Sequence, residues 1–200
     1  MVKLATHNSW SYAKPLKWYM PHFIARCQAV SIQEQYNLGA RLFDLRLRQY
    51  KDQWWASHGP CIFNINYHED LAWLNSKKDV YVRILLEYNS EPKNADCVIE
   101  DFQEECHNLI IQYPNIKFFG GLCKWDWRLA YRFITHPPIF LDSYSSTTSL
   151  FDSDNTFLKI IDDWWPWLYA RLNNQKNYNK FIENNNDEYL MVDFINIINQ

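Results

Sequence analysis

Short apolar runs of strand length alternate with helix-like segments along most of this chain. The clearest run is Val80–Leu86, which is apolar apart from Arg83. Such a run is typical of a strand that is covered on both faces, as in a parallel sheet. The predicted strands are Val2–Ala5, Ala40–Leu47, Gln53–Ser57, Val80–Leu86, Ile116–Phe119, Pro138–Leu141 and Tyr189–Ile195.

The segments between these runs have helical patterns. Ser31-Ile32-Gln33-Glu34 is a capping box, in which the serine oxygen and the glutamate side chain bind free amides. Gly39 follows as a stop signal, and Pro166 is expected to kink or break a later helix. The predicted helices are Pro21–Asn37, at least in its second half, His68–Asn75, Asn94–Gln112 and Thr156–Leu172. The asparagine-rich stretch Asn173–Asn186 is expected to be an exposed loop or frayed helix end.

This alternation indicates an α/β fold, and its spacing favours a (β/α) barrel of the TIM type. Such barrels typically have about 250 residues. With 200 residues, the chain is expected to form a small, incomplete or distorted barrel, as one domain spanning residues 1–200. A doubly wound open sheet is the alternative, but the sequence has no glycine-rich phosphate loop to support it.

Composition excludes several classes of function. The formal net charge is −3 and the sequence has no cluster of Lys and Arg, so we expect no nucleic-acid partner. The five cysteines include no C-x-x-C pair and are expected to be reduced core residues rather than disulfides or zinc ligands. No signal peptide or membrane span is visible, so the default expectation is a soluble, intracellular protein.

Polar and charged residues gather at or near the ends of the predicted strands. Barrel enzymes place their chemistry at the carboxyl ends of strands, so these positions are candidates for a site. Two histidines can divide the roles of general base and general acid, and an arginine can bind phosphate with two N–H groups. A carboxylate beside a histidine fixes its tautomer. The residues at strand ends are His7, Asp44, Arg46, His58, Glu87, Asp142 and Asp193.

Together these residues are suited to acid–base chemistry on a phosphodiester. The strand that contains Asp44 and Arg46 carries both on one face, and His58 follows twelve residues after Arg46. We expect Asp44 to support His58 and Asp193 to support His7.

Several segments carry a resemblance to a known family. Thr6-His7-Asn8-Ser9, the stretch from Ser31 to Arg46, and His58-Gly59-Pro60 resemble, in order and spacing, the X-domain of bacterial phosphatidylinositol-specific phospholipase C. Ile139–Tyr144 is similar to that family's strand with an Asp-x-Tyr pair, here Asp142 and Tyr144, which contacts the inositol ring. Val192-Asp193-Phe194 is similar to its closing strand, whose aspartate orients the first histidine.

The resemblance implies a metal-independent mechanism. His7 would be the general base on the inositol 2-hydroxyl, and Arg46 would stabilise the charge on phosphorus. His58, supported by Asp44, would protonate the diacylglycerol oxygen. The products would be diacylglycerol and inositol 1,2-cyclic phosphate, without a cofactor.

The chain also departs from the bacterial pattern. Glu87 stands where bacterial members have a ring-binding lysine, and Glu87 and Asn8 are instead typical of the calcium-dependent eukaryotic enzymes. Arg46, however, stands at the calcium position, where its charge and volume should exclude the ion. If calcium did bind, Asn8, Asp44 and Glu87 would be its ligands. Lys124 and Arg128 are candidates for the second ring-binding cation.

Other interpretations remain open at this point. A glycerophosphodiesterase or sphingomyelinase-D-like barrel would need a Glu-x-Asp metal pair where this chain has Asp44 and Arg46. An altered barrel could bind or cleave a different polyol or lipid phosphodiester. Trp164-Trp165-Pro166-Trp167 either contacts a membrane surface transiently or packs against the barrel. The expected partner is a phospholipid headgroup, and the expected state is a monomer.

Overall fold

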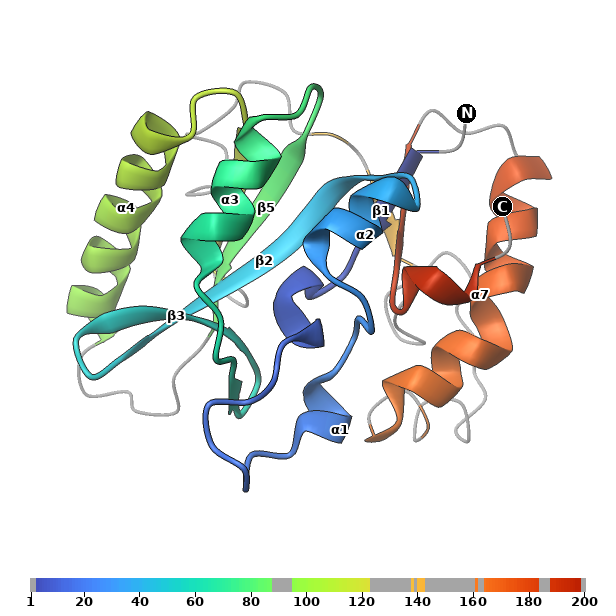
Figure 1. The fold of residues 1–200 in the computed structure, drawn as a ribbon, viewed down its shortest axis with the longest axis horizontal. Helices are drawn as coiled ribbons and strands as arrows, with labels where there is room; N and C mark the ends of the chain where they lie inside the picture. Colours follow the sequence, from blue (N-terminus) through green and yellow to red (C-terminus); the bar gives the residue numbers. More distant parts are fainter. Residues whose placement is uncertain are drawn as a thin grey trace.

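The structure is a computed structural model that describes residues 3–87, 95–122, 138, 140–142, 161, 164–183 and 188–198. Within these residues the chain forms one eight-stranded sheet with helices around it (Figure 1). The strands are β1 (Lys3–Thr6), β2 (Ala40–Tyr50), β3 (Gln53–His58), β4 (Cys61–Ile62), β5 (Tyr81–Leu86), β6 (Lys117–Leu122), β7 (Phe140–Asp142) and β8 (Tyr189–Val192).

Six of these strands pair in parallel, in the order β6-β5-β2-β1-β8-β7. Thr6 pairs with Phe43 and with Val192, and Leu47 pairs with Leu86, so the four central strands end at the same edge. This arrangement confirms the predicted α/β class. It also brings the residues after β1 and β8 together with the second half of β2.

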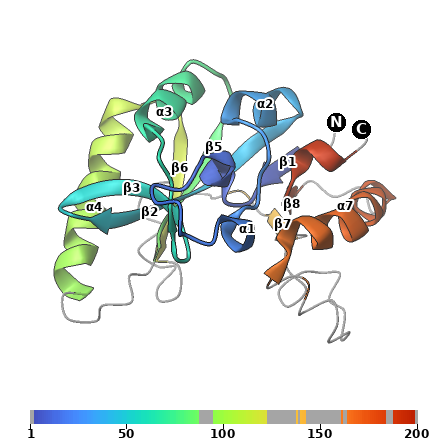
Figure 2. The same ribbon diagram turned by 60° about the horizontal axis from the view of Figure 1, so that its bottom comes forward.

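The helices are α1 (His22–Ala25), α2 (Ile32–Asn37), α3 (Tyr67–Asn75), α4 (Ala95–Gln112) and α7 (Pro166–Glu183), with 3-10 turns at Ser9–Tyr12 and Ile195–Ile197. Figures 1 and 2 show α3 and α4 beside β5, α2 beside β2, and α7 beside β8 at the other side of the molecule. None of the helices in the described residues is both long and apolar enough to span a bilayer.

The predicted helix Pro21–Asn37 is confirmed in its second half but is not continuous. The chain forms the short α1, runs through residues 26–31 without helix, and begins again at Ile32. The capping box is present at this second start: the Glu34 amide donates to Ser31 Oγ (3.3 Å) and the Ser31 amide donates to Glu34 Oε2 (3.2 Å). Gly39, with a φ of 94°, follows the helix as predicted.

The last helix also differs from the prediction. Pro166 is the first residue of α7, a position that suits proline because its missing N–H would have no partner there. The helix continues through most of the asparagine-rich stretch to Glu183, with Asn174 and Asn177 buried. The predicted residues Thr156–Ile160 lie outside the described part of the chain. The final strand ends at Val192, before the predicted Ile195.

A hairpin carries the chain beyond the edge of the parallel sheet. Strand β2 continues to Tyr50 and pairs with the antiparallel β3 through the two-residue turn Lys51-Asp52. Both turn residues have left-handed φ angles, 52° and 57°, which match the twist of the strands. The return strand β3 ends at His58, and this places the histidine over the carboxyl ends of the parallel strands.

The faces of β2 separate the core into two parts. Phe43, Leu45 and Leu47 belong to the large cluster that packs under the helices, as their alternation predicted. On the opposite face, Leu42 packs with Ala5, Phe119 and Met191 inside the sheet's curve. Asp44 and Arg46 follow Leu42 on this inner face, so both lie above a small apolar floor.

Candidate active site

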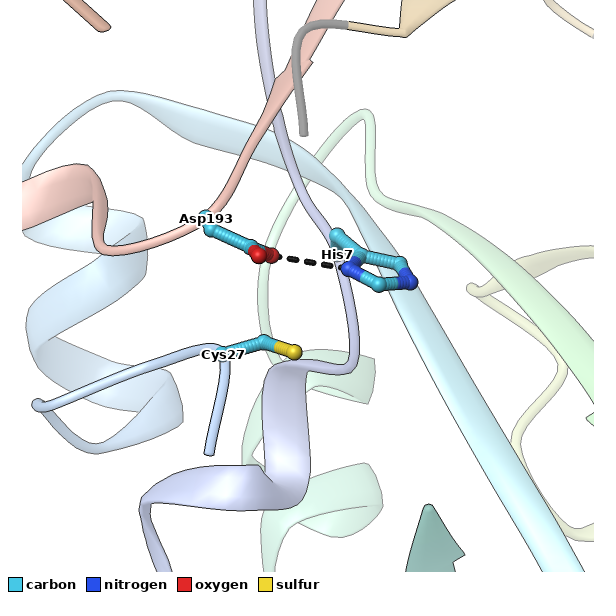
Figure 3. A group of neighbouring side chains, drawn as sticks. All are labelled: His7, Cys27 and Asp193. Atoms are coloured by element: carbon cyan, nitrogen blue, oxygen red, sulfur yellow. Dashed lines mark hydrogen bonds and ion pairs between the residues drawn. The ribbon is translucent and has the colours of Figure 1, made fainter. Parts of the chain in front are cut away.

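His7 follows β1, and both of its ring nitrogens are engaged. Nε2 lies 2.8 Å from Arg46 Nη2 and 3.0 Å from Asn8 Nδ2. Because a guanidinium can only donate, Nε2 must be the unprotonated acceptor. Nδ1 therefore carries the proton and donates it to Asp193 Oδ1 at 2.8 Å, a pair that Figure 3 shows. The expected pairing of His7 with Asp193 is confirmed.

Burial is the main cause that holds the pKa of His7 well below its ordinary value, and the charge of Arg46 adds to it. The ring is therefore neutral at neutral pH, with a lone pair on Nε2. A neutral imidazole whose tautomer is fixed by a carboxylate is what a general base requires.

Arg46 contacts Asp44 and Glu87 in addition to His7. Its Nε and Nη2 each donate to Asp44 Oδ2 at 3.2 Å, and its Nη1 donates to Glu87 Oε2 at 3.3 Å. Asp44 is fully buried and also accepts from the Asn8 amide (3.2 Å). The guanidinium thus occupies the space between Asp44 and Glu87.

Glu87 joins Arg46 to the turn that carries His58. Its Oε2 contacts Arg46, and its Oε1 accepts from the Gly59 amide at 3.0 Å. The two carboxylate oxygens therefore connect β2 to the end of the hairpin. Glu87, a site candidate by its position at a strand end, is a partner of Arg46 in the structure.

His58 has a different partner from the one expected. Its Nδ1 donates to the backbone carbonyl of Ala25 (2.9 Å), not to Asp44. The reason is that Asp44 faces Arg46 and, at 3.7 Å from its Oδ1, Arg83, whereas His58 reaches α1 from the hairpin. Asp44 therefore does not bind His58 directly, and the support expected from it is limited to its charge, which raises the pKa of His58.

The two histidine rings lie close together, with centroids 5.7 Å apart. Burial is the main cause that lowers the pKa of His58, and Arg46 lowers it further, while Glu87 and Asp44 oppose them. Because Nδ1 holds its proton against Ala25, Nε2 is the nitrogen of His58 that can exchange a proton with a ligand.

Two left-handed residues shape the floor of the site. Asn8 follows His7 with a φ of 43°, and Phe194 follows Asp193 with a φ of 47°. A bulky residue in this region is strained, and such strain gathers at functional sites. The turns orient their amides inward: that of Asn8 donates to Asp44, and that of Phe194 donates to the Cys27 carbonyl (2.6 Å).

Three further side chains lie at this site that were not expected from the sequence. Arg83 is buried below Asp44, and its only signal was a charge in the apolar run of β5. Gln28 binds the carbonyls of His7 (3.1 Å) and Val192 (2.9 Å), and it carries no sequence signal because a buried amide resembles any other glutamine. Cys27 Sγ lies 3.7 Å from His58 Nδ1, although the cysteines were expected only to pack.

The remaining predicted residues are not placed with their side chains. Asp142 is the last residue of β7, and only its backbone is described. Lys124, Arg128 and Tyr144 lie outside the described residues. Cys27, Cys61 and Cys106 are buried free thiols, as expected for reduced core cysteines.

Comparisons with known proteins reveal the fold. No protein-family model and no curated protein sequence matches this chain. By structure it is similar to a mutant phosphatidylinositol-specific phospholipase C from Staphylococcus aureus, with a TM-score of 0.62 and 16% identity over 96% of this chain and 85% of that one. The corresponding enzyme from Listeria monocytogenes has a TM-score of 0.55 and 16% identity over 96% and 88%. The likeness confirms a small TIM-type α/β barrel.

Proposed function

We propose that this protein is a phosphodiesterase that cleaves phosphatidylinositol-like phospholipids by histidine acid–base catalysis, releasing diacylglycerol and inositol 1,2-cyclic phosphate. The observation that carries the proposal is the pair of histidine rings 5.7 Å apart with a guanidinium bound to one of them. The solved structures with the same fold bear the name of that activity, which agrees with the chemistry of these residues.

His7 acts as the base. Its Nε2 lone pair takes the proton of the inositol 2-hydroxyl while the hydroxyl oxygen attacks phosphorus. Asp193 then holds the resulting imidazolium through Nδ1. Arg46 and Asn8 bind Nε2, so substrate must displace both contacts. This exchange moves the guanidinium from His7 to the phosphate oxygens.

His58 acts as the acid. Its Nε2–H gives a proton to the glycerol oxygen as the bond from that oxygen to phosphorus breaks. The acid must be charged before the reaction, although burial lowers the pKa of His58. A bound phosphodiester anion favours the imidazolium, so substrate itself promotes the active protonation state.

Arg46 stabilises the charge that develops on the non-bridging oxygens. Asp44 and Glu87 hold the guanidinium in place from two sides. Its positive charge stands where a calcium ion would need these same carboxylates, which supports a metal-independent reaction.

Headgroup recognition is assigned to residues other than Glu87. Glu87 is engaged by Arg46 and Gly59, so it is poorly placed to bind an inositol hydroxyl. We assign ring contacts to Asn8, Asp142 and Tyr144, and a second phosphate or ring contact to Lys124 or Arg128. Cleavage of a different polyol or lipid phosphodiester is the alternative function.

A lipid substrate also requires a membrane-facing surface. Trp18 is 90% exposed, and its neighbour Tyr19 and Phe23 of α1 are also exposed. Trp164, Trp165 and Trp167, around the start of α7, are each about half exposed. Figures 1 and 2 show α1 beside the start of α7. We propose that these aromatic residues, here called the aromatic rim, touch the lipid surface transiently.

The test is incubation with phosphatidylinositol vesicles, with and without EDTA, followed by phosphorus NMR for the cyclic phosphate. His7→Ala and His58→Ala should each lose roughly 10²- to 10⁴-fold in kcat. The matched control is His107→Ala, an exposed histidine on α4. Product from a glycerol or sphingoid phosphodiester alone would favour the alternative substrate, and near-normal rates in both histidine variants would disprove the mechanism.

A further inference from the structure

Three potential metal ligands meet on the side of His7 that faces away from Arg46. One ring nitrogen of His7, Cys27 Sγ and a carboxylate oxygen of Asp193 all lie within 4.8 Å of one another, and all three residues are buried. Nδ1 is the nitrogen of His7 that faces Asp193, at 2.8 Å. Figure 3 shows the three side chains converging from separate segments. Imidazole nitrogen, thiolate sulfur and carboxylate oxygen are the ligands that zinc binds in proteins.

The three segments are held in fixed register by one side chain. Gln28, next to Cys27, donates to the carbonyls of His7 and Val192 and accepts from the Ile195 amide (3.2 Å). The Cys27 amide donates to Ser11 Oγ at 2.8 Å. These contacts hold the backbone of the three ligand residues in place before any ion binds.

We propose that His7, Cys27 and Asp193, here called the His–Cys–Asp cluster, form an inhibitory binding site for zinc and similar thiophilic divalent cations. The inhibition rests on the proposed function, because the proposed function assigns His7 the role of base. The metal binding does not depend on it. The sulfur and nitrogen donors favour such ions over calcium or magnesium, which prefer oxygen ligands.

Coordination changes the protonation of both ligands in a defined way. The metal bonds to the Nδ1 lone pair, so the proton that Nδ1 now donates to Asp193 moves to Nε2. The Cys27 thiol releases its proton to solvent and binds as thiolate. Asp193 exchanges its hydrogen bond for a bond to the metal, and a water molecule completes the fourth position.

This exchange removes the function of His7. With a proton on Nε2, the ring has no lone pair to accept a proton from a substrate hydroxyl. The N–H at Nε2 would also face the donor groups of Arg46 and Asn8, now 2.8 Å and 3.0 Å away, so these side chains must turn aside. The metal therefore inactivates the base and displaces the guanidinium together.

Binding is measured independently of activity. Protein freed of metal with EDTA is titrated with cadmium, a zinc substitute whose bond to thiolate gives an ultraviolet charge-transfer band. Wild type should show one equivalent of this band. Cys27→Ala should lose it, whereas Cys106→Ala, which removes another buried free thiol, should keep it.

The affinity for zinc, measured by calorimetry, should fall roughly 100-fold in Cys27→Ala, since even partners outside the ligand set are worth about 10- to 100-fold. Asp193→Asn, which keeps the side-chain shape, should weaken binding similarly and serves as the second variant if Cys27→Ala does not fold. Unchanged cadmium and zinc binding in these folded variants would overturn the site.

The cleavage rate with zinc is then measured for wild type, Cys27→Ala and Cys106→Ala. Each rate is divided by the rate of the same protein without metal. Wild type and Cys106→Ala should be inhibited in parallel with occupancy, and Cys27→Ala should resist. Equal inhibition of Cys27→Ala would overturn the proposal by showing that zinc acts elsewhere. A wild type that binds cadmium but cleaves no phosphodiester would instead refute the proposed function and leave the metal site standing.

Discussion

Arg46 holds the candidate site together because its guanidinium reaches His7, Asp44 and Glu87 at once. A lysine would keep the charge but could not make these contacts, since an ammonium is a point charge on a flexible stem. Arg46→Lys should therefore lower kcat by roughly 100-fold, within the range for removing one electrostatic donor. The measurement is the initial rate on phosphatidylinositol.

Arg41 provides the matched control for this substitution. It lies on the same strand, but its guanidinium stacks on Tyr36, 3.8 Å from the ring centroid, away from the site. Arg41→Lys should keep the wild-type rate. If Arg46→Lys were as active as Arg41→Lys, a positive charge alone would be sufficient for catalysis. The role of the two N–H groups of Arg46 would then be wrong.

The two buried histidines should also make folding stability depend on pH. Both have folded-state pKa values below the ordinary value of about 6.5. Below that pH the unfolded chain binds protons that the folded chain does not, so stability falls as pH decreases from 6.5. The slope is about 1.4 kcal/mol per pH unit for each histidine that stays neutral when folded.

Chemical denaturation between pH 7.5 and 5.5 measures this slope. His7→Gln should reduce it, because the variant has one buried imidazole fewer. His107→Ala, which changes an exposed histidine, should keep the wild-type slope. An identical slope in His7→Gln would mean that His7 is charged in the folded state.

Strands β5 and β6 approach so closely that their contact depends on a glycine. A Cβ built on Gly120, whose φ is 134°, would fall onto the backbone carbonyl of Ile84. Because backbone cannot turn aside as a side chain can, Gly120→Ala should destabilise the fold by more than about 2 kcal/mol. Thermal denaturation is the measurement.

Gly59 offers the comparison of a glycine with space around it. A Cβ there would meet nothing within 4 Å, although the φ of 52° is left-handed. Gly59→Ala should therefore cost only the conformational strain, about 1 kcal/mol. Equal losses in both variants would indicate that backbone conformation, rather than strand contact, determines the requirement at Gly120.

Glu87 couples the end of β5 to the hairpin turn and to Arg46. Its charge also raises the pKa of His58 against the lowering by burial and Arg46. Glu87→Gln keeps the shape but removes the charge, so the pKa of His58 should fall. As the acid must be protonated, the alkaline limb of kcat/KM against pH should move to lower pH.

Glu69→Gln, an exposed change on α3, serves as the control and should leave the pH profile in place. A Glu87→Gln variant with a lower rate but an unshifted alkaline limb would show that Glu87 supports the turn only. In that case its charge would not act on His58.

Elements with local signals were predictable from the sequence. The capping box at Ser31 begins α2, and the apolar run around Arg83 forms β5. The segment Pro21–Asn37 is helical in its second half but not throughout, because residues 26–31 are held by tertiary contacts: Cys27 and Gln28 bind Ser11, His7 and Val192. Such contacts override helical propensity and leave no periodic pattern to detect.

The candidate site was predictable in its residue types but not in all its pairings. His7 meets Asp193 because both follow neighbouring parallel strands, whose ends must coincide. His58 meets the Ala25 carbonyl instead of Asp44 because it arrives on an antiparallel hairpin, whose direction depends on the turn at Lys51-Asp52. A backbone carbonyl carries no sequence signal, so this partner could not be inferred.

Across the whole molecule, the site and the aromatic rim lie at one end. The His58 ring contacts α1 through Ala25, and α1 and the segment before it carry Trp18 and Phe23. The chain before α1 is fixed by β4: the Leu16 amide donates to the Ile62 carbonyl (2.7 Å). A bilayer that touched the rim would therefore present headgroups beside His58.

The variant Trp18→Ala with Phe23→Ala tests this arrangement. Burying one large apolar side chain is worth about 1.5–3 kcal/mol, so vesicle affinity should fall roughly tenfold or more. Cosedimentation with phosphatidylinositol vesicles measures the affinity, and cleavage of vesicle substrate should fall with it. Hydrolysis of a monomeric, water-soluble inositol phosphodiester should be maintained, because His7 and His58 are held by hydrogen bonds to other residues.

Ile111→Ala controls for the loss of any exposed apolar side chain. Ile111 is as exposed as the rim residue Tyr19 but lies on α4, which is apart from α1 in both views (Figures 1 and 2). The Ile111→Ala variant should bind vesicles as tightly as wild type. If the double rim variant bound vesicles as tightly as Ile111→Ala, the membrane surface would have to be elsewhere. A parallel loss on the soluble substrate would instead mean that α1 acts on catalysis, because a displaced Ala25 carbonyl would no longer hold the His58 tautomer.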